Sequence, residues 1–380
     1  MAKTPWEMVS DVDAVDQDYL TNLLAQAGYS GADVVKFERE IITDKQYGGG
    51  MVVRFRLLYG PDTAESNPKS LILKVCKPNS AQRNDSGHIS REAHCYEYGL
   101  LDNLSPGLYI PKHFSTVVHL ESGTYWLWME DLGVEAFQIA WTAETVQKVV
   151  RDIAGMHAVW WERRVELEAF TFLRYRAQAM YQRQYIQCFE RLCTAIDSHP
   201  RAAVINKVLT RPRRDLLRGL QDIEDQVYEK LDALPQTLLH QDVWPPNIGF
   251  HQGKTALIDW SYAGIGTPGV ELCPLAFNGV FWIRDVVEKD EELLLEPLWR
   301  TLHHEYGLPI DYEDIRSGYL LALTLRPASQ LIFPVLQGII TGRSPVPKDV
   351  TDYSNTEAWL DLFNIGLQKI EHAAQQTGIF

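Results

Sequence analysis

Cysteine is scarce in this 380-residue sequence, and its distribution argues against a disulfide-bonded protein. The chain has five cysteines, an odd number, and no Cys-x-x-Cys pair. A disulfide framework normally uses an even set of cysteines in an oxidising compartment. We therefore expect a protein of the reducing cytoplasm. The five are Cys76, Cys95, Cys188, Cys193 and Cys273.

Long apolar segments are also missing. No uninterrupted apolar run reaches the roughly 18 residues of a membrane-spanning helix. The longest candidate, residues 319–340, is interrupted by Arg326, Pro327 and Pro334. The first residues, Met-Ala-Lys-Thr-Pro-Trp-Glu, lack the apolar core of a signal peptide. We expect no membrane partner and no secretion signal.

Basic charge is in the minority. The chain has 36 Lys and Arg against 50 Asp and Glu, a formal net charge of −14. This balance argues against nucleic acid or an anionic membrane as the main partner. It would suit a cationic substrate, although solubility alone explains it as well. The length fits two lobes, and 46% hydrophobic residues are ordinary for a soluble globular protein.

The nucleotide-binding loop G-x-x-x-x-G-K-[ST] is absent, which disfavours a Walker-type fold. The most informative segment that is present covers residues 239–260. It reads Leu-His-Gln-Asp-Val-Trp-Pro-Pro-Asn, followed after a short interval by Ile-Asp-Trp. It places Asp242, Asn247 and Asp259 at a spacing that suits phosphoryl transfer from a magnesium nucleotide.

A hairpin explains how these three residues come together. Residues 248–250 and 256–258 are β-prone, and Gln252-Gly253 is a turn signal between them. The ends of a hairpin meet, so Asp259 should lie beside Asn247. An amide oxygen and a carboxylate form a hard oxygen site suited to Mg²⁺. Asp242, on the same loop, could then orient or deprotonate an incoming hydroxyl; a plain turn aspartate is the alternative.

The rest of the chain predicts a β-rich N-terminal lobe, residues 1–133, and a mainly helical C-terminal lobe, residues 134–380. In the first lobe we expect strands and two helices, from the alternation and helical stripes of apolar residues. In the second, Thr142 is a candidate N-cap of a helix that reaches Trp160, with His157 in its core. The expected strands are 34–42, 51–59, 70–75, 116–120 and 125–129, and the helices 16–27, 88–101, 170–196, 215–231, 291–306, 315–325 and 356–375.

Two residues of the first lobe form a candidate phosphate-binding pair. Lys74 lies in the strand Leu-Ile-Leu-Lys-Val, where it can neutralise phosphates as a point charge. Glu92, at the edge of the inward face of the following helix, is placed to hold that lysine. A lysine and a glutamate on solvent faces are the alternative.

Two backbone segments complete the candidate nucleotide site. Gly48, Gly49 and Gly50 lie between two strands and could bring N–H groups close to phosphates, or form an ordinary flexible hairpin. The segment 126–133, Trp-Leu-Trp-Met-Glu-Asp-Leu-Gly, ends a strand at the lobe junction. A strand edge there could offer N–H and C=O groups to an adenine ring.

With these motifs the sequence resembles the aminoglycoside phosphotransferase and choline kinase superfamily, over about residues 35–275. The resemblance implies a bilobal, protein-kinase-like α+β fold. By resemblance Asp242 is the catalytic aspartate, and Asn247 and Asp259 ligate Mg²⁺. Lys74, held by Glu92, would meet the α/β-phosphates of ATP or GTP. The backbone of Glu130 and Leu132 would bind adenine, with Met129 at the back of the pocket.

The sequence departs from the family pattern at three places. Gln241 stands where the family usually has glycine, within His-x-Asp. Trp244 is more similar to the ecdysteroid-kinase-like and choline-kinase-like branches than to typical aminoglycoside enzymes. Pro-Gly-Val-Glu-Leu at residues 268–272 resembles the family's Pro-x-x-Asp-Leu, with Glu271 in place of aspartate.

The resemblance implies a kinase that transfers the γ-phosphate to a hydroxyl of a small molecule, with antibiotics among the candidate acceptors. A metabolic kinase of the choline or ecdysteroid type is one alternative, and a pseudokinase-type nucleotide-binding module is another. A protein kinase is disfavoured because no Ala-Pro-Glu follows Ile-Asp-Trp. We expect acceptor contacts from residues 170–196 and 273–285.

Overall fold

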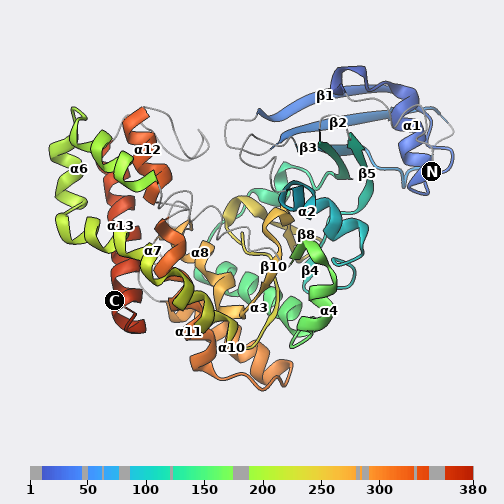
Figure 1. Cartoon of the computed structure of the whole chain (residues 1–380). Coiled ribbons are helices and arrows are strands. Elements are labelled where there is room, and N and C mark those ends of the chain that lie inside the picture. Colours follow the sequence, from blue (N-terminus) through green and yellow to red (C-terminus); the bar gives the residue numbers. More distant parts are fainter. Residues whose placement is uncertain are drawn as a thin grey trace. The chain divides into compact units, whose positions relative to one another are not determined.

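The chain forms two compact units in a computed structural model (Figure 1). Unit 1 comprises Met1–Asp102 and Tyr109–Gln138, and unit 2 comprises Asn103–Leu108 and Ile139–Phe380. None of the helices in the described part of the chain is long and apolar enough to cross a membrane. The structure describes residues 11–44, 50–61, 64–76, 86–119, 123–173, 188–279, 283–284, 291–328, 332–341 and 356–379.

Unit 1 is built on a five-stranded antiparallel sheet in the order β1-β2-β3-β6-β5. Burial alternates along β3, with Leu71, Leu73 and Val75 fully buried. Because successive side chains of a strand point to opposite faces, Lys74 lies on the other face of the sheet. The strands are β1 (Val34–Asp44), β2 (Met51–Tyr59), β3 (Ser70–Cys76), β5 (His113–His119) and β6 (Thr124–Glu130).

Two helices accompany the sheet. Helix α1 (Gln17–Gln26) begins at Asp16, whose carboxylate caps the first turn by accepting from the N–H of Tyr19 at 2.8 Å. Its apolar side packs into the same core as the buried residues of β3, and Trp128 Nε1 donates to the hydroxyl of Tyr19 at 3.1 Å. Helix α2 (Ser86–Glu97) supplies the partner of Lys74. The short elements are η2 (Val12–Ala14) and η4 (Val134–Phe137).

Unit 2 is mainly helical and contains short strands around residues 237–266. Helix α3 (Ala143–Val159) begins as expected at Thr142, whose hydroxyl accepts from the N–H of Thr145 at 3.2 Å. The other helices are α4 (Arg164–Ala169), α6 (Ala202–Val208), α7 (Arg211–Asp232), α8 (Cys273–Phe277), α10 (Glu292–Arg300), α11 (Tyr312–Pro327), α12 (Phe333–Thr341) and α13 (Thr356–Thr377). Strand β4 (Leu108–Tyr109) pairs with β9.

Short elements carry the chain through the centre of unit 2. Strands β7 and β10 pair antiparallel, and so do β8 and β9. Short helical turns connect them and lead into α8. In chain order these elements are η5 (Thr171–Leu173), β7 (Thr237–Leu239), η6 (Pro245–Asn247), β8 (Ile248–His251), β9 (Lys254–Leu257), η7 (Trp260–Tyr262), β10 (Gly264–Gly266), η8 (Pro268–Leu272) and the π-helical turn η9 (Thr301–Glu305).

Two helix predictions were wrong at their ends. The helix expected over 88–101 stops at Glu97, because Gly99 adopts a positive φ of 65° and its N–H bonds back to Tyr96; glycine in this conformation commonly ends helices. The helix expected over 170–196 is interrupted at its start, where the Phe170 ring packs against Trp160 and Phe172. Residues 188–197 are helical, and 174–187 lie outside the described residues.

Candidate active site

The hairpin predicted after Asn247 is present. Strands β8 and β9 pair with Ile248 opposite Leu257, and the turn uses positive φ values at Gln252 and Gly253. The N–H of Ile258 then donates to the carbonyl of Asn247 at 3.1 Å. This bond places the residue after Ile258, Asp259, next to the start of the hairpin, as the sequence predicted.

Asp242 and Asn247 are joined directly. The side-chain amide of Asn247 donates to Asp242 Oδ2 at 2.8 Å and to the Asp242 carbonyl at 3.0 Å. Because the amide nitrogen is turned toward Asp242, the amide oxygen points the other way and can accept or coordinate. Asn247 is buried, with 8% of its surface exposed, so its side chain has a defined orientation.

The charges in this loop are crowded. Burial and, next, the neighbouring carboxylate of Asp259 raise the pKa of Asp242 to about 7, against the opposing influence of Arg326 and of the hydrogen bond from Asn247. Two nearby carboxylates repel each other unless a cation lies between or beside them. Two carboxylates and an amide oxygen are hard donors, and a magnesium ion usually takes one or two protein carboxylates with phosphate and water oxygens. The residues present therefore fit Mg²⁺.

His240 braces the loop through two bonds to backbone groups. Its Nδ1 accepts from the N–H of Asp242 at 3.2 Å, and its Nε2 bonds to the carbonyl of Ile258 at 3.0 Å. The ring also packs edge-on against Trp260, with centroids 4.5 Å apart. His240 thus ties the two motifs together through backbone groups. His157 is a fully buried core histidine, bonded through Nδ1 to the carbonyl of Leu238 at 3.0 Å.

Gln241 adopts the left-handed conformation, with φ 66°. This conformation is easy for glycine and costs energy for other residues. Two buried groups hold it in place. The Glu271 carboxylate accepts from the N–H groups of His240 and Gln241, both at 2.6 Å, and Arg326 donates through Nη2 to the Gln241 carbonyl.

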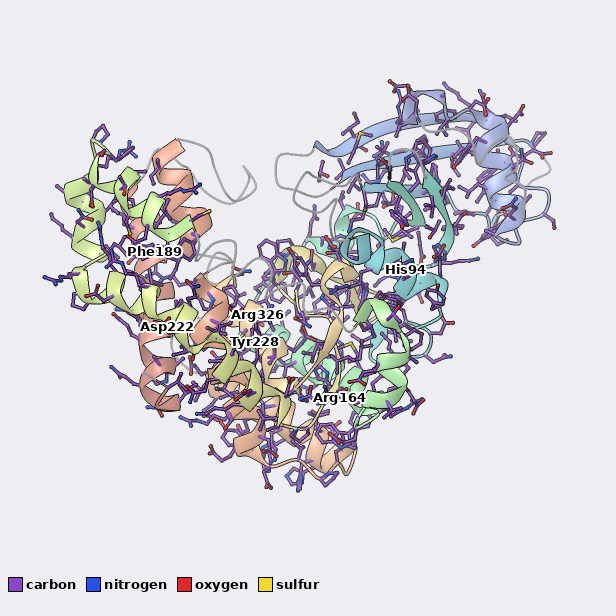
Figure 2. The ribbon with its side chains drawn as sticks, viewed as in Figure 1. His94, Arg164, Phe189, Asp222, Tyr228 and Arg326 are labelled. Atoms are coloured by element: carbon purple, nitrogen blue, oxygen red, sulfur yellow. The ribbon has the colours of Figure 1, made fainter. Side chains whose placement is uncertain are left out.

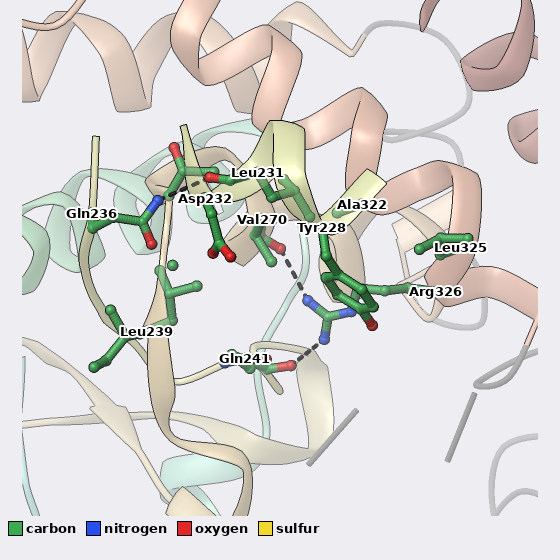
Figure 3. Close-up of a pocket in the computed structure, with 13 residues that line it drawn as sticks. Tyr228, Leu231, Asp232, Gln236, Leu239, Gln241, Val270, Ala322, Leu325 and Arg326 are labelled. Atoms are coloured by element: carbon green, nitrogen blue, oxygen red, sulfur yellow. Dashed lines mark hydrogen bonds between the residues drawn. The ribbon is translucent and has the colours of Figure 1, made fainter. Parts of the chain in front are cut away.

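A cavity of about 60 Å³ lies beside this loop, entirely within unit 2 (Figure 3). Most of its walls are aliphatic, with polar groups contributed by Gln241, Arg326 and Tyr228, among others. It is lined by Tyr228, Leu231, Asp232 and Gln236 around the end of α7, Leu239 and Gln241, Ile265, Gly266, Thr267 and Val270, and Ala322, Leu325 and Arg326 of α11.

In unit 1, Lys74 and Glu92 form the predicted pair. Lys74 Nζ lies 2.5 Å from Glu92 Oε2, and the side chains are 13% and 3% exposed. The pair is inside the unit and not on a solvent face, so the surface alternative for both residues is wrong. Strand β3 and helix α2 therefore present a fixed ammonium group on the face of the sheet opposite the core.

The segment at the end of β6 is held firmly. The N–H of Glu130 donates to the carbonyl of Lys112 at 2.9 Å. The Glu130 carboxylate accepts from Tyr109 at 2.8 Å and from the N–H of Lys112 at 3.0 Å. Met129 is buried, with 7% of its surface exposed. The chain leaves the sheet after Glu130, the last residue of β6.

Gly50 has a structural reason to be glycine. A Cβ built at Gly50 would lie 1.5 Å from the carbonyl oxygen of Val75, so only a residue without a side chain fits against β3. Gly48 and Gly49 lie outside the described residues, and their proposed approach to phosphates stays a prediction. The same holds for the acceptor contacts expected from 170–196 and 273–285, since parts of both segments are not described.

Sequence reasoning gave no role to three residues of the site. Asp131, between Glu130 and Leu132, accepts from Arg54 Nε at 2.6 Å and from the N–H of Gly133 at 3.0 Å. Glu271 and Arg326 hold Gln241. Glu271 was visible as the variant of a family segment. Arg54 and Arg326 had no local signal, because each meets its partner across 77 and 85 residues of sequence.

A family model described as "Phosphotransferase enzyme family", abbreviated APH, matches residues 62–309, more than half of the chain. The chain belongs to this family. Its members transfer phosphoryl groups to hydroxyls of small molecules, so this protein is a small-molecule kinase, as the motifs predicted. A search of the curated proteins found no match.

Solved structures agree on the fold of this phosphotransferase. Choline kinase from Cryptosporidium parvum Iowa II has a TM-score of 0.56 at 11% identity, over 96% of this chain and 98% of that one. Spectinomycin phosphotransferase in complex with ADP and spectinomycin has a TM-score of 0.53 at 13% identity, over 95% of this chain and 99% of that one. The fold is therefore the protein-kinase-like α+β fold, with a β-rich N-terminal and a helical C-terminal lobe.

Proposed function

We propose that this protein transfers the γ-phosphoryl group of Mg²⁺-bound ATP or GTP to a hydroxyl of a small molecule. The observation that carries the proposal is the Asp242–Asn247–Asp259 arrangement, where a hairpin joins an aspartate to two hard oxygen donors. In the transfer, the acceptor oxygen forms a bond to the γ-phosphorus. The bond from that phosphorus to the bridging oxygen of the nucleoside diphosphate breaks.

Asp242 receives the acceptor's hydroxyl proton in this scheme. Its raised pKa supports the role, because a general base works best with a pKa near the operating pH. Asn247 fixes the carboxylate through its amide nitrogen. The side-chain oxygens of Asn247 and Asp259 would hold Mg²⁺. The ion would neutralise phosphate charge during transfer. Asp242 is thus an orienting group as much as a base.

We assign nucleotide binding to unit 1 and catalysis to unit 2. Lys74, fixed by Glu92, would contact the α/β-phosphates as a point charge. The carbonyl of Glu130 and the N–H of Leu132 would contact adenine beside Met129, and Gly48, Gly49 and Gly50 would approach the phosphates. The firm anchoring of Glu130 and Asp131 supports this assignment, since adenine recognition needs a backbone of fixed position.

The acceptor is a small hydroxylated molecule. The formal charge of −14 supports a cationic one, such as an amino alcohol or an amino sugar antibiotic. The mainly aliphatic cavity beside Gln241 supports an acceptor that also carries a small apolar group. Five cysteines, none of which forms a disulfide, and the need for nucleoside triphosphate support action in the cytoplasm.

The decisive experiment is a screen of ATP and GTP consumption with Mg²⁺ against hydroxylated antibiotics, amino alcohols and sugars. Wild type should consume nucleotide at least about tenfold faster with one acceptor class. Asp242→Asn should lower that rate by roughly 10²–10⁴-fold, the usual share of a general base, while calorimetry gives unchanged nucleotide binding. Asp222→Asn, a control at an exposed position of α7 (Figure 2), should behave as wild type.

Three results would count against the proposal. Asp242→Asn with wild-type turnover would remove Asp242 from the chemistry. Tight nucleotide binding without transfer to any acceptor would favour the pseudokinase-type module. Labelling of proteins by radioactive nucleotide would favour a protein kinase.

A further inference from the structure

Arg326 reaches the catalytic loop from a distant helix. It lies near the end of α11, and only 5% of its surface is exposed. Its guanidinium donates through Nη1 to the Val270 carbonyl at 3.1 Å and through Nη2 to the Gln241 carbonyl (Figure 3). One planar side chain therefore links α11, η8 and the catalytic loop, a geometry that a guanidinium can satisfy and an ammonium cannot.

The Gln241 carbonyl belongs to the peptide group that leads directly into Asp242. The N–H of the same peptide group, contributed by Asp242, donates to His240 Nδ1 at 3.2 Å. The peptide plane is thus fixed at its oxygen by Arg326 and at its nitrogen by His240. Since this plane is bonded to the Cα of Asp242, its orientation determines where the Asp242 carboxylate points.

Gln241 would otherwise tend to leave this conformation. Its φ of 66° is disfavoured for any residue with a Cβ, and such strain persists only where surrounding contacts hold it. Its side chain lies over Gly264, where an added Cβ would meet Gln241 Nε2 at 2.4 Å. Arg326 on the carbonyl and Glu271 on the N–H are the contacts that hold the backbone.

Close packing of α11 on η8 allows Arg326 to reach its partners. A Cβ added at Gly269 would lie 2.0 Å from the Ile315 carbonyl oxygen, and one at Gly318 would lie 2.6 Å from Thr267 Cγ2. Two glycines thus let the backbones of α11 and η8 approach each other. The guanidinium position is therefore set by rigid elements and not by a mobile loop.

We propose that Arg326 is a positioning residue of the phosphoryl transfer. It stabilises the left-handed peptide of Gln241 and so aims Asp242 at the acceptor hydroxyl. This inference rests on the proposed role of Asp242. A purely electrostatic role, in which Arg326 only offsets the charge of Glu271, would be filled equally well by lysine.

The test compares Arg326→Lys, Gln241→Gly and the double variant, with Arg316→Lys on the same helix as control. Arg326→Lys keeps the charge but cannot bond both carbonyls, and misplacing a catalytic group by about 1 Å can cost about 10²-fold. We expect kcat to fall about 10- to 100-fold while KM for nucleotide changes less than about twofold. In the Gln241→Gly background, where the left-handed conformation is free of strain, Arg326→Lys should lower kcat by less than about threefold.

A second measurement does not need turnover. Hydrogen exchange of the Asp242 amide should accelerate in Arg326→Lys by about the same factor, and be unchanged in Arg316→Lys. If the wild-type protein transfers no phosphate, the proposed function is wrong. The hydrogen-exchange measurement then tests by itself whether Arg326 fixes the Gln241–Asp242 peptide group. The inference is overturned if Arg326→Lys retains kcat and exchange protection, or if the losses in the two single variants simply multiply in the double variant.

Discussion

The two units differ in where non-glycine residues adopt positive φ and in which groups surround the charged residues of the candidate sites. Among the described residues, all five non-glycine residues with positive φ belong to unit 2, and Gln241 and Asp259 are two of them. The charged residues of the candidate nucleotide site in unit 1 are matched with opposites, Lys74 with Glu92 and Arg54 with Asp131. In unit 2, by contrast, Asp242 has another carboxylate for a neighbour.

This difference agrees with the proposed assignment of nucleotide binding to unit 1 and of catalysis to unit 2. A nucleotide site works if it is already formed, so paired charges and regular strands suit it. A catalytic loop must hold groups in arrangements that they would not adopt by themselves, and strained or repelling groups cluster at such sites. Changes to the Lys74–Glu92 pair of unit 1 should therefore affect stability and nucleotide affinity together, whereas changes to Asp242 or Asp259 of unit 2 should lower turnover without lowering stability.

Among the variants that test this difference between the units, Asp259→Asn should have the largest effect, a loss of turnover. The amide keeps the shape of the side chain but would weaken the proposed Mg²⁺ site, and a metal ion typically contributes several kcal/mol to such a transition state. We expect turnover to fall by at least about 10³-fold, while urea unfolding gives an unchanged or higher free energy of unfolding, because Asp242 loses a repelling neighbour. A loss of stability of more than about 1 kcal/mol would contradict the assumed repulsion.

Breaking the Lys74–Glu92 pair of unit 1 should, in contrast, lower the stability of the protein and its affinity for nucleotide. Lys74→Met leaves Glu92 buried without its cation, and removing one partner of a buried pair typically costs about 3–5 kcal/mol. Urea unfolding should show that loss, and KM for nucleotide should rise. The double variant Lys74→Met/Glu92→Leu should be more stable than Lys74→Met alone. An equally unstable double variant would show that the pair is not the cause.

An intermediate effect is expected where α11 meets η8. Gly269→Ala forces the two backbones apart, which should cost about 1–3 kcal/mol, as overpacking usually does. It should also lower kcat, since it moves Arg326. Gly60→Ala is the control in unit 1, because its Cβ would meet nothing closer than 3.9 Å. If both variants unfold at the same urea concentration as wild type, the close approach is not rigid.

The smallest effect should come from an exposed charge. Arg54 also contacts Glu40, at 3.3 Å, but the Glu40 side chain is 46% exposed. Glu40→Gln should therefore change the free energy of unfolding by less than about 1 kcal/mol. Asp131→Asn, which removes the partner with a 6% exposed side chain, should cost clearly more. Equal losses in the two variants would mean that burial does not distinguish these contacts.

Much of the site was predictable because its signals are local. The turn at Gln252-Gly253 and its flanking strands predicted where Asp259 would lie relative to Asn247. Helix α3 begins at the predicted cap, Thr142. In each case the residues that determine the geometry are close in sequence.

Contacts between distant segments could not be predicted in this way. Nothing near Arg326 indicates that it bonds Gln241, since the bond depends on how α11 packs on η8. The glycine usual at position 241 in the family did hint at a positive φ, but not at what would hold glutamine there. The Phe170 ring, at the end of α4, likewise contacts Trp160 and Phe172, which the helical pattern of residues 170–196 did not indicate.

The pairing of β3 with β6 has a consequence for the size of the nucleotide. Lys74 lies opposite Leu127 and Leu71 lies opposite Glu130, so the lysine and the proposed adenine contact are three residue steps apart along one ladder. At about 3.4 Å per step, this is roughly 10 Å. The pairing of the two strands thus sets the distance between the proposed adenine contact and the lysine that would bind the phosphates. Inserting a residue in β3 between Leu71 and Lys74 would lengthen that span and turn Lys74 to the other face of the sheet.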